Sequence, residues 1–98
     1  MPETRMHRPV AAGDLVFSEE LNRAGFAARA AEPGDSFEIC DTGTYELVAT
    51  GRAKPAAGAP LYLASNGAPT TDHEGPRIGT IVAVVNADMM RVSVALNA

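Results

Sequence analysis

Residues 78–96 read IGTIVAVVNADMMRVSVAL and contain the clearest strand pattern in the chain. From Met90 to Leu96 apolar side chains occupy alternate positions, which is the period of a β-strand with one buried face. Residues 78–85 are almost continuously apolar and β-branched, which is typical of a strand covered on both faces. Because residues 86–88 read Asn-Ala-Asp, the pattern predicts that the two runs form a hairpin.

Similar short runs precede this stretch, each ended by turn residues. Apolar and polar residues alternate over 36–40 and 45–50, and Asp41-Thr42-Gly43 between them predicts a second hairpin. Further strands are expected at 61–63 and, with weaker patterns, at 15–17 and 26–30. Only Ser18 to Arg23 has helix-like ends, and we interpret it as a loop. The roughly six to eight short strands predict an all-β fold, a small antiparallel β-barrel or sandwich.

The chain has 98 residues, which is the size of one domain. Residues 1–13 mix Pro, charged and small residues without a period, and we expect a flexible, extended N-terminal arm there. Residues 14–98 are then expected to form a single β-domain.

Charge and composition argue against several classes of function. With 8 Lys and Arg against 12 Asp and Glu, the net charge of -4 disfavours nucleic-acid binding. We expect no signal peptide, because residues 1–10 lack an apolar run, and no membrane span, because no apolar run approaches about 20 residues. The single cysteine, Cys40, excludes an internal disulfide and is expected to be a partly buried structural thiol.

No residue pattern predicts catalysis or a cofactor. Asp72-His73-Glu74 is the densest group of metal-ligand types, but neighbours in an extended loop point apart, so a solvated loop is favoured. His7 has no positioned proton partner in the pattern. The Gly-Asp steps at Asp14 and Asp35 are ordinary turn chemistry. We expect a protein that is not an enzyme, with no metal site and no cofactor.

Taken in order, the pieces of the chain form a series over about Val10 to Leu96. They are Gly13-Asp14-Leu15-Val16, Gly25-Phe26-Ala27, Pro33-Gly34-Asp35-Ser36-Phe37-Glu38-Ile39, Gly43-Thr44-Tyr45-Glu46-Leu47, Ala57-Gly58-Ala59-Pro60-Leu61-Tyr62, Ile78-Gly79 and Val92-Ser93-Val94-Ala95-Leu96. This series resembles that of the small capsid cement, or decoration, proteins of tailed bacteriophages.

The resemblance implies a non-catalytic protein that binds the outer surface of a phage head and stabilises the shell. It also implies the major capsid protein as partner, a homotrimer, a place on the capsid surface of the virion, and synthesis in the cytoplasm of the host bacterium. The arm of this chain departs from the family's short starts because it is richer in charge, with Glu3, Arg5 and Arg8.

We predict that the arm makes the capsid contact. Arg5 and Arg8 would pair with acidic capsid groups, while Met6, Pro9 and Val10 would pack. Self-association is expected as well, because the apolar residues around the last hairpin exceed what one thin sheet face can hide. They are Ile81, Val82, Val84, Val85, Met89 and Met90.

Three other functions share much of this pattern. A generic β-barrel interaction module of a cellular complex would show the same strands and turns. A small metal-dependent enzyme would use Asp72, His73 and Glu74. An oligonucleotide-binding barrel would bind single strands in a salt-sensitive way, which the acidic charge disfavours.

Overall fold

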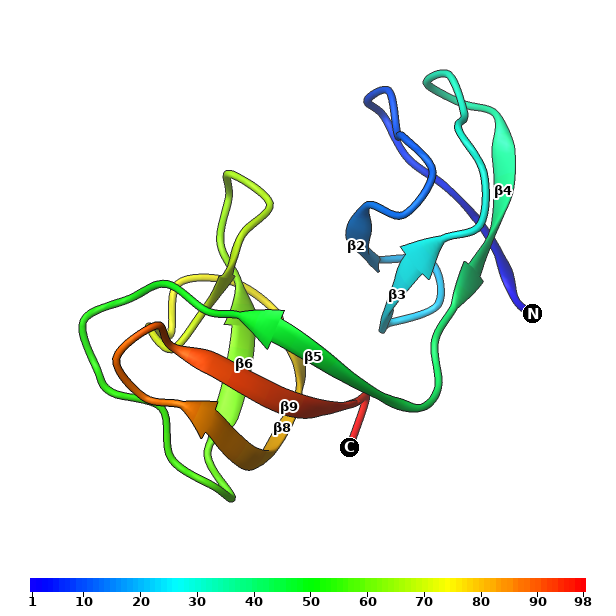
Figure 1. Cartoon of the computed structure of the whole chain (residues 1–98). Coiled ribbons are helices and arrows are strands. Elements are labelled where there is room, and N and C mark those ends of the chain that lie inside the picture. Colours follow the sequence, from blue (N-terminus) through cyan, green and yellow to red (C-terminus); the bar gives the residue numbers. More distant parts are fainter. The chain divides into compact units, whose positions relative to one another are not determined.

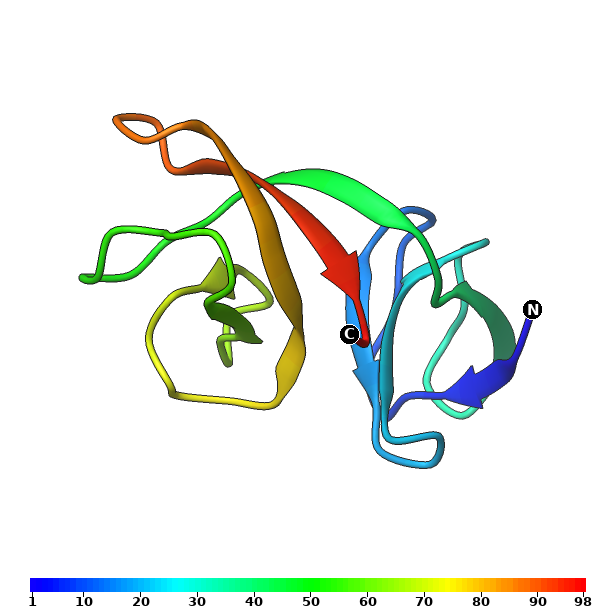
Figure 2. The ribbon, with the colours of Figure 1, turned by 90° about the horizontal axis from the view of Figure 1, so that it is seen from below.

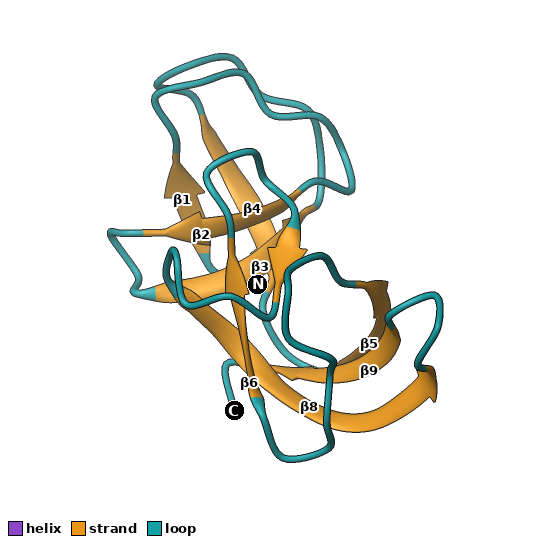
Figure 3. Ribbon diagram, turned by 90° about the vertical axis from the view of Figure 1, so that its left-hand side faces the viewer, coloured by secondary structure: helices purple, strands orange, loops and turns teal.

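The computed structural model describes residues 1–98, which fold into β-strands and loops without a helix (Figure 3). The chain divides into two compact units, Met1–Asp41 and Thr42–Ala98, and each contains one antiparallel sheet (Figure 1). The predicted all-β, antiparallel fold class is therefore confirmed, and both sheets curl as those of small barrels do. No helix is long and apolar enough to cross a bilayer.

The first unit is a four-stranded sheet with the order β1-β4-β3-β2. Its strands are β1 (Glu3–Arg5), β2 (Leu15–Ser18), β3 (Arg23–Ala27) and β4 (Ser36–Cys40). Alternation along β4 turns Phe37 and Ile39 into the core, where Val16 of β2 meets them. The weak strand expected at 26–30 lies earlier, at Arg23–Ala27. It includes Gly25, where a Cβ would come within 2.9 Å of the Cys40 carbonyl oxygen.

The two edge strands of this sheet meet. The buried hydroxyls of Thr4 on β1 and Ser18 on β2 lie 2.5 Å apart, and the Ser18 oxygen also accepts a hydrogen bond from the Leu21 N–H. A hydrogen-bonded contact between edge strands is possible only if the sheet curls strongly, so this pair marks the closure of the first unit.

The second unit is a five-stranded sheet with the order β5-β9-β8-β6-β7. Its strands are β5 (Thr44–Val48), β6 (Pro60–Leu63), β7 (Pro69–Thr70), β8 (Arg77–Asn86) and β9 (Arg91–Leu96). The predicted hairpin of β8 and β9 is confirmed, and β9 alternates as expected, with Val92, Val94 and Leu96 buried. After β5, Thr50 forms a parallel bridge with the buried Thr70 of β7, so the ends of this sheet also meet.

Strand β8 differs from the prediction of a strand covered on both faces. Its first half is buried at Ile78 and Ile81, but Val82 and Val85 are about half exposed, at 49% and 51%. The register with β9 slips twice, between Ile81 and Ala83 and between Val84 and Asn86, so both exposed valines are extra residues without a cross-strand partner. Figure 2 shows how strongly β8 bends along its length.

Two other predictions about the strands are wrong. β4 and β5 do not form a hairpin, since β4 pairs with β1 and β3 whereas β5 pairs with β9. Alternation identifies a strand but carries no information about its partner. Met90 belongs to the turn, not to β9, because its φ of 53° leaves the extended region.

Candidate functional site

The segment of residues 5–10, predicted to make a contact, is held to the first sheet at three points. Arg5 lies opposite Ser36 in the ladder of β1 and β4. The Met6 carbonyl oxygen accepts a 2.9 Å hydrogen bond from the Gly34 N–H. Val10 is buried and exchanges two 2.9 Å backbone hydrogen bonds with Ala31. The backbone of this segment is therefore hydrogen-bonded to the sheet or its loops on both sides of residues 7–9.

Between these anchors, His7, Arg8 and Pro9 are exposed and form what we call the tip. Of the five predicted contact residues, Arg5, Arg8 and Pro9 are accessible to a partner. Met6 is half-buried against the core and Val10 lies within it, so these two side chains hold the segment from below. That residues 1–13 move as a flexible arm stays a prediction, because the contacts describe position and not motion.

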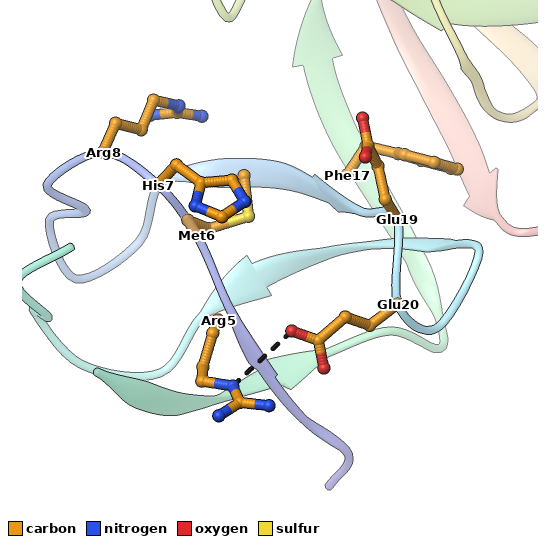
Figure 4. Close-up of a pocket in the computed structure, with 7 residues that line it drawn as sticks. All are labelled: Arg5, Met6, His7, Arg8, Phe17, Glu19 and Glu20. Carbon is orange, nitrogen blue, oxygen red and sulfur yellow. Dashed lines mark ion pairs between the residues drawn. The ribbon is translucent and has the colours of Figure 1, made fainter. Parts of the chain in front are cut away.

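A pocket of about 340 Å³ lies beside the tip (Figure 4). Residues 5–8 line it together with Phe17 of β2 and with Glu19 and Glu20 of the following turn. In the view of Figure 4, Met6 and His7 lie on one side and Phe17 and Glu19 on the other. The curl of the sheet brings the turn after β2 next to β1, so residues far apart in sequence share this pocket.

Opposite charges are distributed around the pocket. The Arg5 Nε lies 3.6 Å from Glu20 Oε1, and both side chains are at least half exposed, so the pair contributes at most about 1 kcal/mol. Arg8 and Glu19 also line the pocket, and neither has an ion pair. The site thus combines two apolar side chains with unpaired charge of both signs, and it contains no nucleophile with a base.

Sequence reasoning found Arg5, Met6 and Arg8 but missed Phe17, Glu19 and Glu20. The only local signal was that the acidic residues Glu19 and Glu20 follow the aromatic residue Phe17 closely in the sequence. Nothing in the sequence placed that pair beside the basic residues of the first segment, because their proximity depends on the closure between β1 and β2.

Residues 72–74 have structural contacts in the second unit. Asp72 Oδ1 accepts a 3.1 Å hydrogen bond from the Arg52 N–H, and the His73 ring stacks on Tyr62 with centroids 4.4 Å apart. No group of three His, Cys, Asp or Glu side chains in the structure could hold a metal ion. Cys40 is half-buried, and its sulfur lies 3.2 Å from the Met1 sulfur.

Comparison with known proteins yields one family. The family described as phage cement protein matches residues 3–96, which include all nine strands and the pocket. No curated protein and no solved structure matches the chain significantly.

Proposed function

The chain belongs to the phage cement protein family, whose structural, non-catalytic members associate with the capsid, and from this we propose that it binds the outer surface of a phage head and stabilises the shell. The observation that carries the proposal is the family match over residues 3–96, which leaves neither unit outside it. Repetition of one modest contact over many equivalent capsid sites would give such a protein its effect through avidity. We propose synthesis in the host cytoplasm before docking.

The major capsid protein is the partner we propose for the tip. Arg5 and Arg8 would meet acidic capsid groups and Pro9 would pack against the shell, while Met6 and Val10 keep the segment in place. The support is the combination of an exposed, partly basic loop with backbone hydrogen bonds on both sides of it, which would reduce the entropy lost on binding.

A homotrimer is the assembly we propose. Four apolar side chains of the second unit are between 49% and 57% exposed, at the end of β5, on β8 and in the following turn. They are Val48, Val82, Val85 and Met89. Contact with neighbouring copies would cover them.

The function is tested by mixing the purified chain with expanded capsids of the phage that encodes it and measuring occupancy by sedimentation and cryo-microscopy. We expect saturable binding on the outer surface. Arg8→Gln should lower the affinity about 5- to 10-fold, because a charge-assisted contact is lost. Deleting residues 1–10 is a poor test, since it would also remove β1 and Val10 from the fold. No binding of the unmodified chain would refute the proposal.

A further inference from the structure

The lining of the pocket beside the tip includes charged residues of both signs. Arg5 and Glu20 form an ion pair across 3.6 Å. Arg8 and Glu19, on the same lining, have neither an ion pair nor a side-chain hydrogen bond in this chain. Unpaired charges of both signs at one pocket favour a partner that also presents both signs there.

The lining of the pocket also includes apolar surface. Met6 and Phe17 both remain half-exposed, and Met6 packs against the core of the first unit. A volume of about 340 Å³ is at the lower end of the roughly 300–1,000 Å³ range of ligand pockets. An apolar centre with a charged rim is the arrangement in which a single inserted side chain contributes most to binding.

We propose, on the basis of the proposed function, that this pocket receives one apolar side chain from a segment of the major capsid protein. A carboxylate beside that side chain pairs with Arg8, and a basic group on its other flank pairs with Glu19. The pocket shares Arg5, Met6 and Arg8 with the contact segment, so a shell subunit that covers the tip also covers the pocket. A purely acidic segment fits less well, because Glu19 and Glu20 would repel it.

Charge reversal of the full chain, with binding measured on expanded capsids, tests whether Arg8 meets an acidic partner group and Glu19 a basic one. Arg8→Glu and Glu19→Arg should each weaken binding by about 10-fold or more, and the double reversal should be at least as weak as either, because both partner charges then face like charge. If Arg8 and Glu19 merely attract each other, the double reversal restores binding and the proposal is overturned. Glu3→Lys, a charge reversal on β1 outside the pocket, is the control and should stay within about 2-fold.

Substitutions of Phe17 test the apolar part. Phe17→Ala should weaken capsid binding about 10-fold or more, whereas Phe17→Leu, which keeps apolar volume in the wall, should retain most of it. Circular dichroism and thermal unfolding of each variant identify any that lose the fold. If the unmodified chain binds capsids and all folded pocket variants bind equally well, the pocket proposal fails while the proposed function stands.

A photo-crosslinker identifies the occupant directly. A benzophenone amino acid at position 7, which is exposed, lines the pocket and has no assigned contact, should crosslink on capsids to a peptide of the major capsid protein. Crosslinks to another copy of this chain, or none above those from position 3, would overturn the assignment.

Discussion

At the scale of single residues, the Ser18 hydroxyl makes more hydrogen bonds than any other buried side chain of the first unit. Its oxygen lies 2.5 Å from the Thr4 hydroxyl and accepts the Leu21 N–H at 3.1 Å, and both hydroxyl residues are buried. Removing one member of such a set leaves the others without partners where water cannot replace them.

We therefore predict an order of stability for two substitutions. Ser18→Ala should lower the free energy of unfolding by about 2–3 kcal/mol, because it strands both the Thr4 hydroxyl and the Leu21 N–H. Thr4→Val should lower it by only about 1 kcal/mol, since Ser18 keeps Leu21. Urea unfolding followed by circular dichroism measures both, and the opposite order would contradict the closure we describe.

At the scale of elements, the pairing of β8 with β9 depends on close approach at Gly79. A Cβ there would lie 2.3 Å from the Ala95 carbonyl oxygen, which is backbone and cannot rotate away. Gly79→Ala should thus lower the free energy of unfolding by about 2–3 kcal/mol. Ala83→Ser, at an exposed position of the same strand, is the matched control and should change it by less than about 0.5 kcal/mol. Chemical unfolding of both variants compares them.

The elements themselves could largely be predicted from the sequence, but their partners could not. Alternation located β4, β5 and β9 because burial of one face imposes a period of two. It wrongly joined β4 to β5, because Asp41-Thr42-Gly43 is a turn-like sequence whether or not the flanking strands pair. The bulges of β8 left Val82 and Val85 exposed without any sequence signal. The pocket likewise required knowledge of which strands close the first sheet.

At the scale of the molecule, the two units each have a small core of their own. Units the size of Met1–Asp41 are close to the roughly 40-residue limit below which folding usually needs extra support. In the proposed homotrimer, burial of the exposed valines and Met89 of the second unit would add stability through association.

The proposed association predicts that the thermal unfolding midpoint depends on protein concentration. If copies associate through these side chains, the thermal midpoint should rise with protein concentration, because mass action favours the folded oligomer. Val82→Ser with Val85→Ser should abolish that rise and convert the trimer to monomer in sedimentation velocity, with little change in the midpoint at low concentration. Thr80→Ser serves as the control on the same strand. A monomer at all concentrations would contradict the homotrimer.

Fastening the backbone on both sides of residues 7–9 has an evolutionary consequence. Neither His7, Arg8 nor Pro9 contributes to the interior, so these positions are free to vary without a penalty in folding. If the tip contacts the capsid as proposed, a virus whose capsid protein changes in sequence could regain a matching partner by changing three codons. The same exchangeability would let an engineer graft a short peptide there and display it across a particle's exterior.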